Sequence, residues 1–241
     1  MRRSSPSPGF SLVEVLVTIS VIALLLTLMV PALRAVRKKG RESAILAGTR
    51  QHVSVLTLYT HDFKDSHPWA GTPDADGRNF LPLPASSEVF PSYYFQLSST
   101  WTLLLAGYYD GLWPHPSQRN PSGGRGAGYQ YSCAMLADPA YWHPVSAGAR
   151  RHLRATATHE VRYPDRKALL AGGIDVDPYP VWVRDGVILG FSEGSASFTP
   201  SSMLVEPLRR GDGPVPGVFH VRGFFGLDTR AGILGIDADR R

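Results

Sequence analysis

The longest hydrophobic stretch of the chain runs from Phe10 to Val30, as FSLVEVLVTISVIALLLTLMV, and Glu14 is its only charged residue. A helix that rises about 1.5 Å per residue would extend these residues over about 31 Å, enough to cross a hydrocarbon core of about 30 Å. A cleaved secretory signal has a shorter apolar region and a small-residue cleavage site, whereas VPALRAV follows here. The pattern therefore predicts a membrane-spanning helix.

The pattern beyond Pro31 keeps a helical period but becomes amphipathic. Residues that can face a folded body recur at three- and four-residue steps, which predicts that the helix continues to position 63. Pro31 lacks a backbone N–H and should bend or loosen the turn before it. Breaking residues after position 67 then end the helix. The recurring positions are Ile45, Thr49, His52, Leu56, Tyr59 and Phe63, and the breakers are Pro68, Gly71 and Pro73.

Short apolar runs separated by turn residues predict strands in the second half of the chain. A Pro- and Ser-rich connection precedes them, and residues 101–109 predict a short helix or strand. A long helix followed by antiparallel strands indicates an α+β fold, in which a long N-terminal hydrophobic helix packs on a C-terminal globular domain with a small antiparallel sheet. The expected strands are 129–133, 167–171, 181–183, 187–191 and 196–198, with a hairpin turn at 192–195.

Composition narrows the function classes. Hydrophobic residues make up 43% of the 241 residues and charged residues 19%, which is typical of a folded protein. The net charge of +5 is modest and the basic residues are spread out, without a basic patch interleaved with aromatic residues, so nucleic-acid binding is not expected. Cys133 is the single cysteine, which leaves neither an internal disulfide nor a cysteine-based zinc site.

The presence of Glu14 in this segment requires an explanation, because a charged side chain at the centre of a membrane helix costs on the order of 2.5–3.5 kcal/mol. The surrounding residues, GFSLVEVL from Gly9 to Leu16, resemble the processing motif of prepilin-type proteins, the type IV pilins and type II secretion pseudopilins. The resemblance implies cleavage by prepilin peptidase between Gly9 and Phe10, N-methylation of Phe10, and Glu14 as the fifth residue of the mature chain. Pro31 then falls where family members commonly carry a helix-kinking proline.

The C-terminal part resembles one branch of these proteins, which carries an H-x9-DG motif. Four segments carry this likeness: GYQYSCAML, VRYPDRKALLAGG, FSEGSASF and LRRGDG. The motif is degenerate here, because Glu193 stands where the branch has Asp and Val183 stands where it has His.

The resemblance implies a pilin-like structural subunit and not an enzyme. It implies a basic leader at 1–9, a helix at 10–63 with a transmembrane and assembly half (10–30) and an amphipathic half (31–63), and a globular domain at 64–241. Expected partners are prepilin peptidase, other pilin or pseudopilin subunits, an inner-membrane assembly platform and the lipid bilayer. Phe10 and Glu14 are the expected assembly residues, together with Pro31.

The implied location is the inner membrane, crossed once with the N-terminus cytoplasmic and the body periplasmic, followed by a periplasmic or surface filament. Basic residues counted alone favour the opposite orientation, because more of them follow the apolar run than precede it. They are Arg34, Arg37, Lys38, Lys39 and Arg41, against Arg2 and Arg3 in the leader. A membrane-anchored periplasmic binding domain or enzyme with a simple anchor helix is the alternative function.

Candidate chemistry is sparse elsewhere. Asp74, Asp76 and Asn79 offer closely spaced oxygen ligands that could hold calcium, against the simpler interpretation of a solvated turn. The solvated turn is the favoured interpretation, so no cofactor is expected, and calcium at these residues is the weaker alternative. No G-x-S-x-G nucleophile motif or phosphate-binding loop fits the chain, which agrees with a structural role.

Overall fold

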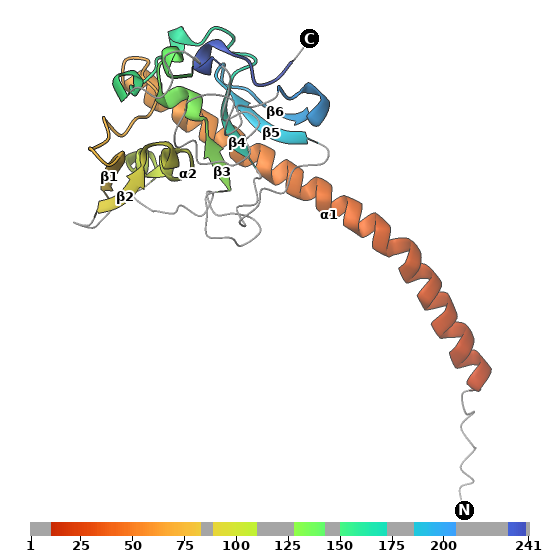
Figure 1. Ribbon diagram of the computed structural model, residues 1–241. Coiled ribbons are helices and arrows are strands. Elements are labelled where there is room, and N and C mark those ends of the chain that lie inside the picture. Colours follow the sequence, from red (N-terminus) through yellow and green to blue (C-terminus); the bar gives the residue numbers. More distant parts are fainter. Residues whose placement is uncertain are drawn as a thin grey trace, which may run out of the picture. The chain divides into compact units, whose positions relative to one another are not determined.

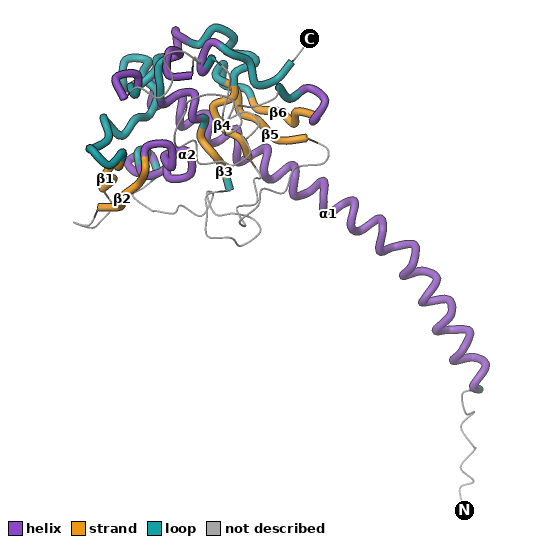
Figure 2. Tube along the Cα trace, viewed as in Figure 1, coloured by secondary structure: helices purple, strands orange, loops and turns teal. Residues whose placement is uncertain are grey.

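The computed structural model describes residues 11–82, 89–109, 128–142, 150–172, 186–205 and 231–239. The chain divides into two compact units, Met1–Ser43 and Ala44–Arg241, and the long helix α1 (Leu12–Asp62) contributes to both. In the first unit α1 stands alone, and its side chains from Ser11 to Gly40 are all exposed. Figure 1 shows the elements in order along the chain, and Figure 2 distinguishes helix, strand and loop.

The second unit is built around a four-stranded antiparallel sheet in the order β3-β4-β5-β6. Its strands are β3 (Tyr129–Tyr131), β4 (Ala168–Gly172), β5 (Gly186–Phe191) and β6 (Ala196–Pro200). They confirm the predicted strands at 129–133, 167–171, 187–191 and 196–198, whereas the predicted strand at 181–183 lies outside the described residues. The structure therefore has the expected α+β fold, with a long N-terminal helix packed on a small antiparallel sheet.

The tight hairpin between β5 and β6 follows the predicted turn. The Gly194 N–H donates to the Phe191 carbonyl at 3.0 Å, and the Phe191 N–H donates to the Ser195 carbonyl at 2.7 Å. Gly194 has a φ of 99°, which suits a glycine at the bulge that ends such a turn. The Glu193 N–H donates to the Pro164 carbonyl, so the turn is held against the segment before β4.

The part of α1 within the second unit lies on one face of the sheet, and glycines make close contact possible (Figure 1). Gly48 on the helix faces Tyr129 of β3. Gly172 on β4 lies under Thr49, and Gly190 on β5 lies under Val53. A Cβ at Gly172 would be only 2.5 Å from Thr49 Oγ1, so these positions leave no room for a side chain.

The opposite face of the sheet is covered by the chain near its C-terminal end. A second buried cluster combines side chains of β4 and β5 with Ala238 and the partly buried Leu204. Leu204 and Ala238 form an isolated antiparallel bridge, and the Asp237 N–H donates to the Arg166 carbonyl at 2.9 Å. Both faces are therefore buried, which explains why all six residues of β5 are inaccessible. The other members of this cluster are Ala168, Ala171, Val187, Leu189 and Phe191.

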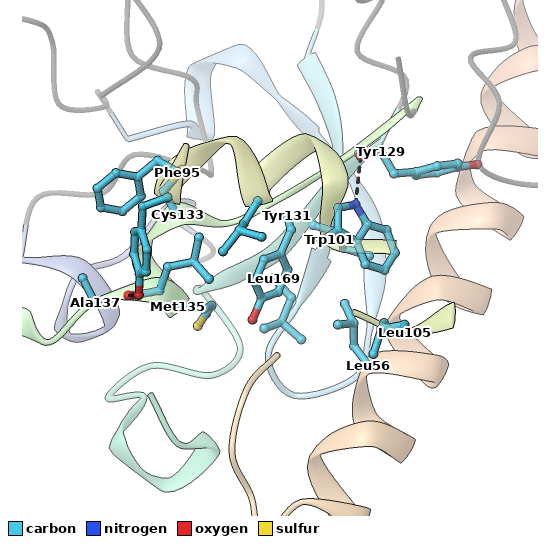
Figure 3. Packing of buried hydrophobic residues seen from close by; sticks show 14 of the residues in the cluster. Leu56, Phe95, Trp101, Leu105, Tyr129, Tyr131, Cys133, Met135, Ala137 and Leu169 are labelled. Carbon is cyan, nitrogen blue, oxygen red and sulfur yellow. Dashed lines mark hydrogen bonds between the residues drawn. The ribbon is translucent and has the colours of Figure 1, made fainter. Parts of the chain in front are cut away.

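Aromatic side chains fill much of the main core, as Figure 3 shows. Trp101 is fully buried, and its Nε1 donates to the Tyr129 carbonyl at 3.1 Å. His52 of α1 is packed among these rings, with its Nδ1 2.7 Å from the Tyr109 hydroxyl and its ring edge-on to Tyr129 at 4.5 Å. A histidine that is predicted from spacing to lie on the body-facing side of α1 thus forms part of the core.

The segment between α1 and β3 differs from the sequence-based expectation. The Pro- and Ser-rich connection contains an antiparallel hairpin of β1 (Arg78–Pro82) and β2 (Val89–Tyr93). Residues 101–109 form neither a regular helix nor a strand but consecutive 3-10 turns that follow the short helix α2 (Leu97–Thr100). The 3-10 segments of the described residues are Tyr94–Gln96, Trp101–Leu103, Ala106–Tyr108, Cys133–Leu136, Pro139–Trp142, Arg150–His152, Thr158–Glu160, Ser201–Met203 and Gly232–Leu234.

Candidate functional site

The start of α1 holds Glu14 in a defined local structure. The Ser11 N–H donates to Glu14 Oε2 at 2.8 Å, and the Glu14 N–H donates to Ser11 Oγ at 3.2 Å. This reciprocal pair is a capping box, in which a Ser and a Glu three residues later satisfy two of the free N–H groups at a helix start. A carboxylate is also favoured there by the positive end of the helix dipole.

The rest of this helical segment exposes apolar side chains in every direction. Leu12 is 85% exposed and Leu28 is 68% exposed. Hydroxyl side chains within the segment donate to carbonyls of the preceding turn, such as Thr18 Oγ1 to the Glu14 carbonyl at 2.7 Å, so they present no free donor. Pro31 lies inside the helix, which continues through it. By length and composition α1 can cross a membrane, and it is suited to anchoring the chain there.

Gly9 and Phe10, the two residues of the expected cleavage site, lie outside the described residues. The helix begins immediately after them, with Glu14 in its first turn. Residues 6–30 match the prokaryotic N-terminal methylation motif. This motif is the prepilin-type N-terminal motif, and it implies processing by prepilin peptidase.

The match covers the N-terminal segment and leaves the body without a family assignment. Comparisons with curated proteins and with solved structures find no significant match.

The predicted calcium ligands occupy a turn that leads into β1. Asp74 Oδ1 accepts hydrogen bonds from the N–H groups of Asp76 and Arg78, at 2.9 and 2.8 Å. The guanidinium of Arg150 donates to the carbonyls of Asp74 and Ala75, and so places a positive charge on the same turn. Three oxygens that a cation could use, Asp74 Oδ1 and the two carbonyls, are thereby engaged by the protein itself.

Asn79, the third predicted ligand, points into the body. Its Nδ2 donates to the carbonyls of Ala70 and Gly71, at 3.1 and 3.0 Å, and ties the strand to the chain that follows α1. Across the described residues there is no group of three or more His, Cys, Asp or Glu side chains that could hold a metal ion. Calcium binding by Asp74, Asp76 and Asn79 stays a prediction.

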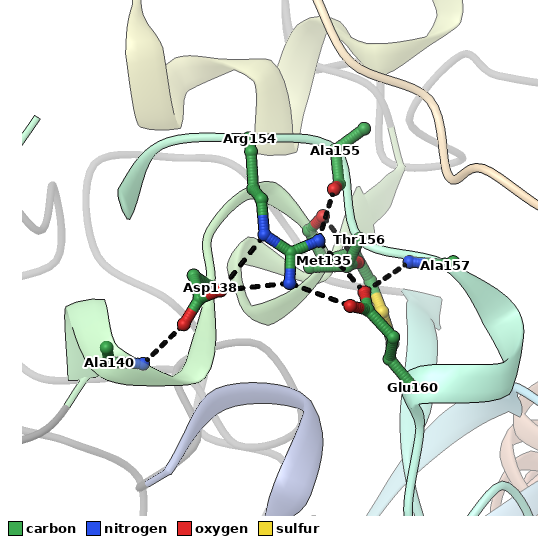
Figure 4. Close-up of polar contacts among 8 residues, drawn as sticks. All are labelled: Met135, Asp138, Ala140, Arg154, Ala155, Thr156, Ala157 and Glu160. Carbon is green, nitrogen blue, oxygen red and sulfur yellow. Dashed lines mark hydrogen bonds and ion pairs between the residues drawn. The ribbon is translucent and has the colours of Figure 1, made fainter. Parts of the chain in front are cut away.

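The densest polar cluster of the body is centred on Arg154 (Figure 4). Its guanidinium donates to both carboxylate oxygens of Glu160, at 3.0 and 2.7 Å, and to Asp138 Oδ2 at 2.9 Å. The Arg154 hydrogen bonds hold the pKa of Glu160 below its usual range. Burial alone would raise the pKa of Asp138, but the Ala140 N–H and Arg154 outweigh it and lower that pKa. These satisfied ion pairs join residues 138–140 to 154–160 and leave no reactive group.

A buried ion pair and a buried histidine are part of the folded core of the second unit. Lys167 Nζ lies 3.0 Å from Asp237 Oδ2, and both side chains are almost completely buried. Asp237 Oδ2 also accepts the Ala168 N–H at 2.9 Å. This pair connects the start of β4 to the segment on the far face of the sheet. His67 is 2% exposed, and neither ring nitrogen has a hydrogen-bond partner within the described part of the chain.

Ser11 is the site residue that the sequence-based prediction missed. The signal was present, because Ser-x-x-Glu before an apolar run is the sequence signature of a capping box. Within the described residues, the Glu14 carboxylate accepts a hydrogen bond from the Ser11 N–H.

Proposed function

We propose that this chain is a pilin-like structural subunit that is processed after Gly9 and assembled into a type II secretion pseudopilus or a type IV pilus-like filament. The proposal is supported by one combination: a prepilin-type motif over residues 6–30, and a first helical turn in which Glu14 is the only acid among the exposed residues 11–30. Its role would be structural and not enzymatic. The leader would be 1–9, the helix 10–63, and the body 64–241.

Cleavage between Gly9 and Phe10 would create a free amine one residue before Ser11, and N-methylation would keep it charged. In a bundle of staggered helices, this amine on one subunit would meet Glu14 of a neighbour. At about 4 Å and an effective dielectric near 20, the attraction is roughly 4 kcal/mol before desolvation is subtracted. An unpaired charge in an apolar bundle costs several kcal/mol, so the pair would favour one register of assembly.

The capping box adds a competitor to this scheme, because Glu14 already accepts the Ser11 N–H. Substitution can therefore separate two roles of Glu14, the cap of its own helix and the ion pair with the amine of a neighbouring subunit. Glu14→Gln keeps an acceptor suited to the capping box but removes the charge. Ser11→Ala removes the hydroxyl of the cap, at a cost of about 1 kcal/mol to the first turn, but keeps the carboxylate.

The first experiment is the N-terminal sequence and mass of the protein extracted from membranes of a host that has the peptidase. A start at N-methylated Phe10 is expected. An intact Met1, or a cut beyond residue 30, would refute processing and favour a binding domain or enzyme on a simple anchor.

The second experiment compares incorporation of the Glu14→Gln and Ser11→Ala variants into sheared filaments. Both variants should be processed, Glu14→Gln should be incorporated poorly, and Ser11→Ala should resemble the wild type. Loss of incorporation in Ser11→Ala but not in Glu14→Gln would show that Glu14 acts only as a helix cap. Wild-type incorporation of Glu14→Gln would refute the ion pair.

In this scheme the chain crosses the inner membrane once before assembly, with its body in the periplasm. Its other partners would be further pilin or pseudopilin subunits and the assembly platform. Pro31 would loosen the helix where the apolar half ends, because it removes the hydrogen bond to the Thr27 carbonyl. Thiol labelling of a cysteine placed in the body, with Cys133 replaced by Ser, would test the orientation: labelling in intact spheroplasts is expected, and labelling only after lysis would reverse it.

A further inference from the structure

A row of basic side chains follows the apolar part of α1, and all of its positions except Lys39 fall on one side of the helix. Arg34, Arg37 and Lys38 stand at the first, fourth and fifth positions of this row, and the sequence continues the spacing at position 41. Because the segment is helical, these positions fall within about 100° of the helix circumference. We call Arg34, Arg37 and Lys38 the basic stripe. All three are exposed, and the Lys38 side chain is 63% exposed.

The surroundings of the basic stripe on the same helix make it amphipathic. Val36 is 67% exposed and Leu33 is 50% exposed, and both lie outside the basic arc. One acid is close: Glu42 Oε1 lies 4.0 Å from Lys38 Nζ. A cationic arc beside an apolar one on an exposed helix is the arrangement of segments that lie at a membrane–water interface.

The position along the helix identifies the partner. The apolar run ends at Val30, so Arg34 follows about 6 Å later and Lys38 about 12 Å later. The polar headgroup layer extends about 5–8 Å beyond the hydrocarbon core on each side. Long basic side chains can also bend back towards it along their apolar stems. The three cations therefore fall at the depth of the phospholipid phosphates.

We propose that the basic stripe binds the phosphates of anionic phospholipid headgroups and thereby sets the depth of α1 in the bilayer. This inference rests on the membrane anchoring that the proposed function includes. Glu14 precedes Arg34 by about 30 Å along the helix, which equals the thickness of the hydrocarbon core. With Arg34 held about 6 Å outside the core, the Glu14 carboxylate would lie about 6 Å inside the opposite edge of the core, where a charge costs less than at the centre.

The test measures phospholipids that remain bound to the full-length precursor after extraction from vesicles of equal phosphatidylcholine and phosphatidylglycerol. Native mass spectrometry counts both lipid classes on each variant. The stripe variant is Arg34→Gln, Arg37→Gln and Lys38→Gln. The matched control removes three exposed cations from the second unit: Arg50→Gln, Lys64→Gln and Arg151→Gln. Body integrity is checked by the urea midpoint of tryptophan fluorescence.

The wild type and the control should retain phosphatidylglycerol preferentially. Each cation near an anionic surface contributes about five-fold, so the preference of the stripe variant should fall by roughly 100-fold. Salt at 0.5 M should weaken the wild-type preference, because the cations are exposed.

An unchanged preference in the stripe variant, or an equal loss in the control, would overturn the inference while leaving the proposed function intact. No bound phospholipid of either class on any variant would instead refute membrane anchoring. Because the uncleaved precursor is used, neither outcome depends on processing at Gly9.

Discussion

Replacing Gly190 by alanine should destabilise the body, because the new Cβ would point from β5 into α1. That Cβ would lie 3.0 Å from Thr49 Cγ2 and closer still to Val53 Cγ2, whereas carbon atoms pack well at about 3.5–4.0 Å. Overpacking of this kind costs about 1–3 kcal/mol, and the intrinsic gain of alanine over glycine offsets about 0.5–1 kcal/mol. We expect a net loss of about 1–2 kcal/mol in the free energy of unfolding.

The contact with Val53 can be tested directly in a double-mutant cycle. Val53 is fully buried, so Val53→Ala removes two methyl groups and should cost about 2 kcal/mol. In the double variant, the alanine at Gly190 occupies part of the vacated space. The combined loss should therefore be at least 1 kcal/mol smaller than the sum of the single losses.

Urea titration of the full chain in mild detergent measures these values through tryptophan fluorescence, since Trp101 and Trp142 are buried. Gly107→Ala is the control, because a Cβ at that position would meet nothing within 4 Å. Its midpoint should match the wild type. If the losses at Gly190 and Val53 were additive within about 0.5 kcal/mol, the helix and strand would not be in the contact described.

Three further predictions concern the buried and paired charges of the body, each measured by the same titration. Burial lowers the pKa of His67 to about 4, so between pH 6.5 and 4 the unfolded chain takes up a proton that the folded chain does not. The free energy of unfolding should therefore fall by about 3 kcal/mol over this range. His67→Leu should remove this part of the pH dependence. Lys167→Met should cost about 3 kcal/mol by leaving Asp237 buried without its cation, and adding Asp237→Asn should restore more than 1 kcal/mol, whereas no recovery would contradict the buried pair. Arg154→Ala should cost about 1 kcal/mol at neutral pH, because the cluster is partly exposed, and this difference should vanish as the pH falls through the lowered pKa of Glu160. A difference that persisted at acidic pH would assign Arg154 a packing role only.

Hydrophobic pattern alone located most of the sheet. The runs that form β4 and β5 are continuous, apolar and bounded by turn residues, as expected of strands that are buried on both faces. The hairpin of β1 and β2 was not predicted, because its sequence does not alternate between apolar and polar residues as a half-buried strand does. Asn79 is polar yet buried, Phe80 is apolar yet 56% exposed, and Pro91 pairs with Phe80 in a two-stranded ribbon in which both strands are edges.

Residues 101–109 were ambiguous for a different reason. The run WTLLLAGYY has no period that separates helix from strand, and its backbone is set by what its rings contact. Trp101 and Tyr109 pack around His52 of α1, and the backbone between them adopts 3-10 turns. Such contacts depend on the tertiary structure, so local propensity does not predict them.

Of the polar groups described above, the sequence indicated those whose partners are local and not those whose partners are distant along the chain. Glu14 is conspicuous in sequence because one carboxylate interrupts an apolar run, and the spacing to Ser11 is local enough to be read directly. The Lys167–Asp237 pair joins residues about 70 positions apart, and nothing in the sequence near either residue indicates the other. A buried charge pair of this kind is visible only once the fold brings both elements together.

The contact of Gly190 with Val53 also sets an order of events during synthesis. The strand that covers this part of α1 is made roughly 140 residues after Val53, which at about 5–20 residues per second takes about 7–28 s. During that interval the helix is complete and its body-facing residues have no sheet to pack on. Folding of the body is therefore delayed by contacts that are distant in sequence, so the nascent chain passes through an aggregation-prone period with its helix made and its sheet still missing.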